Sequence, residues 1–329
     1  MDYNPEKPKT NAKPYLTVEE LTQNPPVGSL ECPPMMSPIY DRVVPQKNNP
    51  NKIPKVVHLS FNSRCLGTEL FADSVQRWKD ALPDWSVYFH DDDAVDRLLQ
   101  EDWPEFPDLH KVMRCIKYGG AMKSDLWRLL VIYRHGGLYS DVDNVPCAEF
   151  KNGTVINPDD SFFSSSNSNT WPNQNLFAME PRHPIAAFAI QEVLKNLLDM
   201  PTLHKPKVFE VTGPVAFRNG YFRFVELTDP KLIASDKGYP VLKLRFFTGF
   251  LNKTLHKEPT NWNFLHPNTN LKVTFNGVEM SQKDREYSLI GKDHWTKYTD
   301  TMDKKLETMS CREYLYRLDN PSEDDLNVP

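Results

Sequence analysis

Residues 117–146 have the sequence KYGGAMKSDLWRLLVIYRHGGLYSDVDNVP. Apolar residues recur in its central part at helical spacing, which predicts a helix over 121–134 with one face turned inward. Gly136 and Gly137 predict the end of that helix, because glycine tolerates the left-handed conformation of a C-terminal cap. Residues 138–140 then predict a short strand, and Asp141 and Asp143 follow directly after it.

The residues before this stretch alternate between strand and helix signals. A strand is predicted at 53–61, a helix at 68–81, a strand at 85–89 and a helix at 91–100. This alternation is typical of an α/β domain with a mostly parallel central sheet and flanking helices. Because ligands bind outside the carboxyl ends of the strands in such sheets, the strand end that carries Asp141 and Asp143 is where chemistry is expected.

The composition is that of a globular chain. The 329 residues include 39% hydrophobic and 25% charged residues, an apolar content too high for a fully disordered chain. The net charge of −5 comes from 39 basic and 44 acidic residues that are mixed along the sequence. Since binding to a nucleic-acid backbone requires a basic surface, no nucleic-acid partner is expected.

Composition also divides the chain into three parts. Residues 1–51 are rich in Pro, Asn, Lys and Glu with almost no apolar periodicity, which predicts a flexible N-terminal arm or stem. The globular domain is predicted over 52–300, and residues 301–329 are expected to form a C-terminal helix and an acidic tail. Inside the domain, the polar run 161–169 is predicted to be a loop over the ligand pocket.

Signals of cellular location are mixed. The longest strongly apolar run, 129–133, is too short to cross a bilayer, so no membrane span is expected in this chain. Five scattered cysteines form no CxxC pair, which argues against a structural zinc site, and their odd number leaves at least one outside any intramolecular disulfide. Sequons at Asn152 and Asn252 would permit glycosylation. We expect a Golgi or other secretory lumen if an anchor lies upstream, and otherwise the cytoplasm.

Asp141 and Asp143 are candidate metal ligands. In an extended chain, residues two apart point to the same side, so both carboxylates would face one site while Val142 points into the core. Two close carboxylates repel, and a divalent cation removes that repulsion. Mn²⁺ or Mg²⁺ takes oxygen ligands and completes its shell with phosphate oxygens. Taken alone, a D-x-D triplet is more often a solvated turn.

The preceding helix adds a second pair of charged candidates. Asp125 and Arg128 lie three residues apart, so both point in one direction from an otherwise apolar helix. They could form a surface ion pair of little energetic value. Alternatively, Arg128 would hold diphosphate or sugar oxygens in charge-assisted hydrogen bonds, and Asp125 would accept hydroxyl protons.

Three segments in this order resemble one enzyme family. They are IPKVVH at 53–58, KSDLWR at 123–128 and YRHGGLYSDVD at 133–143. Together they are similar to the D-x-D glycosyltransferases that include yeast-type initiating α-1,6-mannosyltransferases and inositol-phosphoceramide mannosyltransferases. The resemblance implies a GT-A fold, a Rossmann-like domain that binds a nucleotide sugar. It also implies Mn²⁺ or Mg²⁺, retention of the anomeric configuration, and transfer of a hexose, mannose first, from a GDP- or UDP-sugar to a glycan or glycolipid.

The same resemblance implies roles for individual residues. Asp125 and Arg128 would contact ribose, sugar and diphosphate. Asp141 would reach the ribose and the water shell of the metal, and Asp143 would bind the metal directly.

Further contacts follow from weaker matches to the same family. His294 would supply the last metal ligand, and Trp295 would cover the donor as part of a flap. The remaining implied contacts are Leu59, Ser60 and Phe61 at the nucleobase, Asn175 at the donor sugar or acceptor, and Thr212 and Gly213 in a T-G-P turn near the site.

Two other functions compete with sugar transfer. The pattern from Asp141 to Val145 also fits haloacid-dehalogenase-like phosphotransferases, in which the first aspartate is the nucleophile. That reading expects the motif on the first strand of the domain and leaves Asp125 and Arg128 without a role. A glycosyltransferase-like binding module that has lost turnover is the second alternative, and only an activity measurement separates it from the enzyme.

Overall fold

A computed structural model describes the fold. The described residues are 15–46, 49–69, 71–117, 119–146, 150, 155–168, 171–204, 206–227, 243–250, 263–265, 272–276, 280–289 and 308–321.

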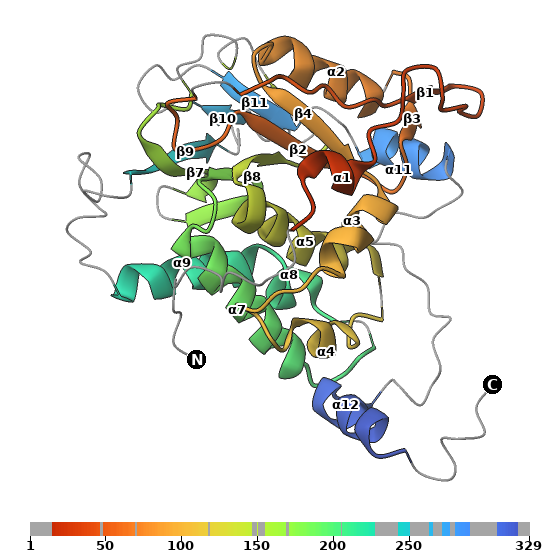
Figure 1. The fold of residues 1–329 in the computed structure, drawn as a ribbon. Helices are drawn as coiled ribbons and strands as arrows, with labels where there is room; N and C mark the ends of the chain where they lie inside the picture. Colours follow the sequence, from red (N-terminus) through yellow and green to blue (C-terminus); the bar gives the residue numbers. More distant parts are fainter. Residues whose placement is uncertain are drawn as a thin grey trace.

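A nine-stranded sheet forms the centre of the molecule (Figure 1). Its strands, in spatial order, are β4 (Ser86–His90), β2 (Val56–Ser60), β5 (Gly137–Ser140), β8 (Trp171–Met179), β7 (Asp160–Ser168), β9 (Lys243–Phe250), β10 (Asn263–Leu265), β11 (Lys272–Asn276) and β6 (Asn144–Pro146). β4, β2, β5, β7, β9 and β11 run in one direction, whereas β8, β10 and β6 run in the other. The predicted α/β class with a mostly parallel sheet and flanking helices is therefore confirmed, with β8 as an antiparallel strand next to β5.

Helices cover both faces of this sheet. The described helices are α1 (Val18–Thr22), α2 (Phe71–Ala81), α3 (Asp92–Leu99), α4 (Leu109–Met113), α5 (Gly119–His135), α7 (Pro184–Leu198), α8 (Val208–Val211), α9 (Pro214–Leu227), α11 (Met280–Leu289) and α12 (Cys311–Asp319). One hydrophobic core joins α3, α4, α5, α7 and α9 to one face of the sheet, and a second core joins α2 to the other face. Figure 1 shows these two layers below and above the sheet.

Alternate residues of β2 and β5 point to opposite faces of the sheet and so contribute to the two different cores. Val57 and Leu59 belong to the core under α2, while His58 between them is buried on the other side. Likewise, Leu138 belongs to the core under α2 and Tyr139 to the core under α5. Strands buried on both faces have near-continuous apolar sequences, as parallel strands covered by helices require.

The N-terminal segment is more structured than its composition suggests. Residues 15–46 contain α1 and β1 (Met36–Pro38), which pairs with β3 (Cys65–Gly67), and a disulfide joins Cys32 to Cys65. Thr17 and Glu20 form a reciprocal capping box at the start of α1, and Leu21 enters the larger core. Over residues 15–46 this differs from the predicted flexible arm, because a capped amphipathic turn and a disulfide supply contacts that periodicity over a long window does not reveal.

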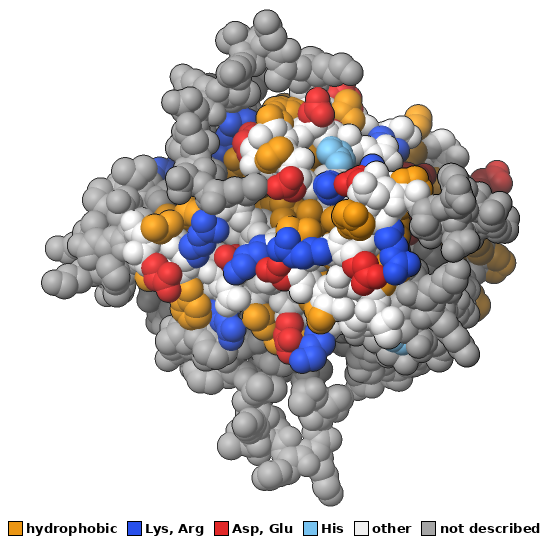
Figure 2. Space-filling model, turned by 90° about the horizontal axis from the view of Figure 1, so that it is seen from below, with side chains coloured by type: hydrophobic (Ala, Val, Ile, Leu, Met, Phe, Trp, Pro, Cys, Tyr) orange, Lys and Arg blue, Asp and Glu red, His pale blue; other side chains and the backbone are white. Residues whose placement is uncertain are grey.

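The C-terminal helix is attached to the same layer. The predicted helix is present as α12, and a disulfide between Cys115 and Cys311 fixes its first residue. Seen from below in Figure 2, this side of the molecule carries Lys and Arg side chains interspersed with Asp and Glu. Cys147 and the two sequons lie outside the described residues. Within the described part, no helix has both the length and the apolar character that crossing a membrane requires.

The polar run 161–169 was predicted as a loop, and this prediction is wrong. Residues 160–168 form β7, which pairs with β8 on one side and β9 on the other. Phe162 and Phe163 point into the two different cores, and Ser164 Oγ donates to the Asn173 carbonyl at 2.8 Å. Ser164 is tolerated in a central strand because a hydrogen bond across to β8 satisfies its hydroxyl.

Two helical glycines provide a test of the packing between α7 and α9. A Cβ added at Gly220 would lie 2.4 Å from Ala189 N, whereas one added at Gly120 would meet nothing within 4 Å. Alanine favours a helix over glycine by roughly 0.5–1 kcal/mol. We predict that Gly220→Ala lowers the unfolding midpoint in urea, whereas Gly120→Ala leaves it unchanged or raises it. Equal shifts in the two variants would contradict the close helix contact.

Candidate active site

The D-x-D segment is a turn at the carboxyl end of β5. β5 ends at Ser140, and the N–H of Asn144, the first residue of β6, donates to the Asp141 carbonyl at 3.0 Å. The extended alternation expected for Asp141 and Asp143 is therefore wrong, because a turn reverses the chain here. Val142 is buried at 6% exposure in the core under α2, as predicted, and both aspartates are half-buried.

Asn144 anchors this turn to its surroundings. The Asn175 carbonyl accepts from Asp141 N and from Asn144 Nδ2, each at 2.8 Å. The Asn144 carbonyl in turn accepts from Trp78 Nε1 at 2.9 Å and from Ser74 Oγ at 3.3 Å on α2. These bonds fix the D-x-D turn between β8 and α2. Asn175, predicted as a contact to the donor sugar or the acceptor, holds the turn through its backbone carbonyl.

Arg128 connects the helix to the turn. Its Nη1 donates to Asp141 Oδ1 at 3.1 Å and to the Gln174 carbonyl at 3.3 Å, and its Nη2 lies 3.1 Å from Asp125 Oδ1. Tyr139 OH also donates to Asp141 Oδ1, at 2.6 Å, and the guanidinium carbon lies 4.8 Å from the centre of the Tyr139 ring. The structure thus brings together Asp125, Arg128 and Asp141, which were predicted as one site.

Asp125 is the buried end of this network. Its Oδ1 accepts from Gln174 Nε2 at 2.8 Å, and its Oδ2 accepts from Thr212 Oγ1 at 2.9 Å. Burial raises the pKa of Asp125 to about 6, against the opposing effects of Arg128 and Thr212. For Arg128, burial lowers the pKa, but Tyr139, Asp141 and Asp125 outweigh burial and the net pKa lies above its ordinary value. The arginine therefore remains charged and the aspartate is ionised at neutral pH.

The donor set suits a hard divalent cation. Asp125, Asp141 and Asp143 contribute three carboxylates against the single guanidinium of Arg128, so the site carries excess negative charge. Carboxylate oxygens are the ligands that Mn²⁺ and Mg²⁺ prefer, and these ions need few protein ligands when phosphate and water complete their shell. Among the described residues, no group of three or more His, Cys, Asp or Glu side chains gathers in a metal-binding arrangement. The turn therefore offers two carboxylates, which suits a cation that takes most of its ligands from elsewhere.

The remaining predicted site residues are Thr212 and Gly213, the group at the end of β2, and His294 with Trp295. Thr212 joins the network through Asp125, and Gly213 allows a close approach, since a Cβ there would lie 2.8 Å from Phe209 Cα. At the end of β2, Leu59 is fully buried and Phe61 is 9% exposed, so Ser60 is the accessible member of that group. His294 and Trp295 lie outside the described residues.

Sequence analysis did not identify Tyr139, Gln174 or Asn144 as site residues. Tyr139 lies two positions before Asp141, a spacing that places both on one side of a strand, so it could have been found. Gln174 and Asn144 carry no local signal, because their roles depend on how β8 and α2 pack against the turn.

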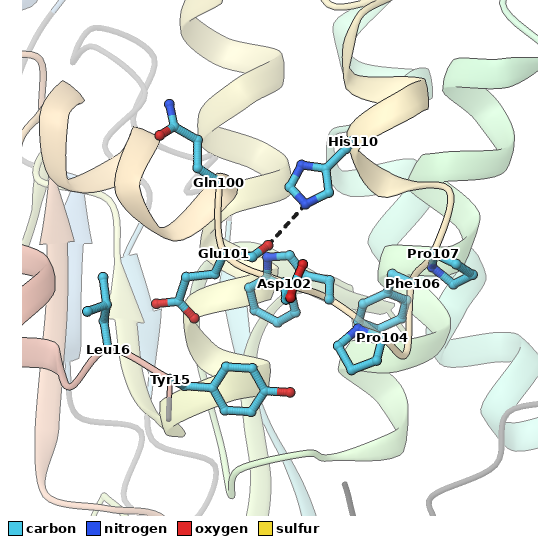
Figure 3. A pocket seen from close by; sticks show the side chains of 10 residues that line it. Tyr15, Leu16, Gln100, Glu101, Asp102, Pro104, Phe106, Pro107 and His110 are labelled. Carbon is cyan, nitrogen blue, oxygen red and sulfur yellow. Dashed lines mark hydrogen bonds between the residues drawn. The ribbon is translucent and has the colours of Figure 1, made fainter. Parts of the chain in front are cut away.

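A cavity of about 670 Å³ lies apart from the D-x-D turn (Figure 3). Tyr15 and the connection between α3 and α4 line it, and Arg134 contacts three residues of this lining. The Arg134 guanidinium lies 3.3 Å from the Tyr15 ring centre and 3.9 Å from the Trp103 ring centre, and it pairs with Glu101 at 2.6 Å. None of the predicted donor contacts lines this cavity. The active site is therefore assigned from the chemistry of the turn.

Comparisons with known proteins agree with that assignment. Residues 68–175 match the family described as "Glycosyltransferase sugar-binding region containing DXD motif". This segment contains the α5 helix, the D-x-D turn and β8 up to Asn175. Over this region the chain is similar to the DXD-containing glycosyltransferases, in agreement with the resemblance of the segments at 123–128 and 133–143.

Individual relatives match short parts of the chain. An initiation-specific alpha-1,6-mannosyltransferase of Candida albicans is 34% identical over 70 residues, which are 21% of this chain and 18% of the relative. Toxin Afp18 of Yersinia ruckeri is 28% identical over 174 residues, 51% of this chain and 7% of the toxin. The chain thus spans a small part of the length of either relative. The solved structure of the PaToxG glycosyltransferase aligns with 16% identity and a TM-score of 0.41, covering 54% of this chain and 71% of that chain.

The raised pKa of Asp125 predicts how its charge affects stability. Asp125 has a pKa of about 6 in the folded protein and an ordinary pKa of 3.8. Because the folded state ionises less readily, the free energy of unfolding falls as the pH rises from 3.8 to about 6. We predict that Asp125→Asn, measured by urea unfolding with EDTA, gains stability relative to the wild type between pH 5 and pH 7.5. The gain should be on the order of 1–2 kcal/mol, since one pKa unit corresponds to about 1.4 kcal/mol. A difference that stays constant with pH would show that the Asp125 pKa is not raised.

Proposed function

We propose that the chain is a metal-dependent, retaining glycosyltransferase that moves a hexose from a nucleotide sugar to a glycan or glycolipid acceptor. The observation that carries the proposal is Arg128, held between Asp125 and Asp141 directly behind the D-x-D turn. A fixed guanidinium beside two carboxylates that fit a divalent cation is suited to a nucleoside diphosphate, which carries several negative charges. Mannose is the first candidate sugar, with GDP as its carrier, because one similar protein is a mannosyltransferase by name. UDP-sugars are the second candidates.

In this proposal the residues of the chain act on the leaving diphosphate. Arg128 donates hydrogen bonds to its oxygens, and Asp125, Gln174 and Tyr139 hold the guanidinium in place. Donors that are already oriented stabilise developing negative charge without rearrangement during the reaction. A bound Mn²⁺ or Mg²⁺, ligated by Asp143 and approached by Asp141, would add Lewis-acid stabilisation of the same charge.

The transfer itself follows a front-face course in this proposal. The bond between the anomeric carbon and the diphosphate oxygen breaks, and the acceptor hydroxyl oxygen bonds to the same carbon from the same side. The hydroxyl proton passes to the departing diphosphate. We do not propose Asp141 as a phosphotransferase nucleophile, because its Oδ1 already accepts hydrogen bonds from Arg128 and Tyr139.

We also propose a secretory-lumen location, such as the Golgi, with a role in glycan biosynthesis. Two disulfides, Cys32–Cys65 and Cys115–Cys311, connect segments of the described chain. Disulfides of this kind persist in oxidising compartments and are rare in the cytosol.

Thermal stabilisation by nucleotides tests the donor site. With Mn²⁺ present, one of UDP, GDP or their sugars should raise the melting temperature of the wild type, and EDTA should abolish the shift. Asp143→Asn should remove this shift and lower turnover by about 100-fold or more, the scale seen when an aligned stabilising group is removed. Asp73→Asn is the matched control, since Asp73 is half-exposed on α2 and should behave as the wild type. A normal metal-dependent shift in Asp143→Asn would refute the assignment.

Arg128 can be tested separately from the metal. Arg128→Ala should weaken binding of the nucleoside diphosphate and also destabilise the fold, because Asp125 would remain buried without its charged partner. Breaking a buried ion pair costs about 3–5 kcal/mol. Arg128→Lys keeps the charge and removes the fork that reaches Asp125 and Asp141 together, so it should fold better than the alanine variant and still bind weakly. Unchanged donor affinity in both variants, measured by calorimetry, would count against a diphosphate contact.

A further inference from the structure

Glu286 on α11 is a fully buried carboxylate that holds two distant parts of the chain together. Its side chain is at 0% exposure. Oε1 accepts from Gly67 N at 2.6 Å, and Oε2 accepts from Phe71 N at 3.5 Å, donors 219 and 215 residues earlier in the sequence. Both carboxylate oxygens are thus engaged by backbone N–H groups, which an uncharged side chain of the same size cannot match.

The two donors belong to fixed elements. Gly67 is the last residue of β3, which pairs with β1 and is tied to Cys32 through Cys65. Phe71 is the first residue of α2, and a negative charge is favourable at the start of a helix because N–H groups are left unpaired there. Glu286 therefore sets the position of α11 against a rigid support.

Tyr287, the next residue, reaches the carboxyl end of β2. Its ring centre lies 5.1 Å from that of Phe61, which in turn packs edge-on against Phe71 at 5.0 Å. In the parallel pairing of β2 with β5, His58 stands opposite Tyr139, so the carboxyl ends of the two strands, at Ser60 and Ser140, lie at the same edge of the sheet. Neighbouring strands lie about 4.8 Å apart. Tyr287 therefore packs on the residue that follows β2, the strand next to β5, at the same end of the sheet as the D-x-D turn.

This arrangement defines the direction in which a bound nucleotide extends. On the β8 side of the turn, Gln174 and Asn175 occupy the space with bonds to Arg128, Asp125 and Asn144. On the β2 side, Ser60 is half-buried, and the ring of Tyr287 packs on Phe61, the residue after the strand. A nucleoside attached to a diphosphate at the D-x-D turn would therefore lie over β2.

We propose that Glu286 is a positioning residue for the nucleoside end of the donor site, and that Tyr287 is the side chain it brings to border the nucleobase. This proposal rests on the proposed donor site. It adds a nucleoside subsite formed by α11, which begins 137 residues after Asp143. Arg128 and the D-x-D turn serve the diphosphate, and α11 serves the nucleoside. Loss of the Glu286 hydrogen bonds should weaken the binding of ligands that contain a nucleoside. The affinity for ligands without a nucleoside should not change.

Calorimetry with two probes tests this division. The probes are the nucleoside diphosphate that stabilises the wild type and inorganic pyrophosphate, each titrated with Mn²⁺. Glu286→Gln loses one of the two acceptor oxygens, and Tyr287→Ala removes the ring. Both variants should bind the nucleoside diphosphate about tenfold more weakly, the equivalent of losing roughly one hydrogen bond to a charged group. Pyrophosphate should bind each of them as tightly as it binds the wild type.

Controls separate this effect from a general loss of structure. Glu313→Gln changes a half-exposed glutamate on α12 and should bind both probes normally. Tyr287→Phe keeps the ring and should restore nucleotide affinity, which a variant that merely unfolds α11 could not explain. Equal weakening of both probes in Glu286→Gln and Tyr287→Ala, or normal nucleotide binding in both, would overturn the proposal. If the wild type binds neither probe in a metal-dependent way, the donor site itself fails, which is a different result.

Discussion

The buried guanidinium of Arg128 is the charge on which the candidate site depends. It lies behind the D-x-D turn with 11% of its side chain exposed, where an unpaired charge would strongly oppose folding. Asp125, Asp141 and the Gln174 carbonyl each accept from it, and Tyr139 covers one face of it. Because these partners come from α5, β5 and β8, satisfying one buried charge fixes three elements relative to each other. The geometry of the candidate site is thus a condition of the fold itself.

The antiparallel strand β8 gives this arrangement its rigidity. A sheet of only parallel strands would leave the residues after β5 as a loop open to solvent on one side. Instead, β8 runs back beside β5 and continues past its end, so the Asn175 carbonyl meets Asp141 N and the side chain of Asn144. The neighbouring Gln174 faces the helix and binds both members of the Asp125–Arg128 pair. Two adjacent residues of one strand therefore hold the turn and the helix in register.

Local patterns predicted the parts of the site that short-range geometry controls. The spacing of Asp125 and Arg128 placed both on one helix face, and the strand-end rule placed Asp141 near them, which the ion pairs confirm. The same reasoning could not identify Gln174, since an amide gains its role only from the pairing of β8 with β5. It also predicted an extended chain at Asp143 where a turn exists, because a D-x-D triplet is compatible with both and the bonds to Asn144 decide between them.

Three histidines lie close together in the fold, and at least two of them, His58 and His135, are uncharged at neutral pH. His58 Nδ1 lies 3.1 Å from His90 Nε2, and its Nε2 lies 3.0 Å from the Gly136 carbonyl. Burial lowers the pKa of His58 to about 4 and that of His135 to about 3, so both stay neutral at neutral pH. Arg128 is the charged group that contacts the carboxylates of Asp125 and Asp141.

The effect of these histidines on stability has the opposite pH dependence to that of Asp125. The histidines destabilise the fold as the pH falls below their unfolded value of 6.5, whereas Asp125 destabilises it as the pH rises from 3.8 towards 6. At neutral pH the fold therefore carries the full destabilising effect of an ionised Asp125 and none from the histidines. The candidate site therefore keeps Asp125 ionised and Arg128 charged at neutral pH, and the fold bears the cost of that pair of buried charges.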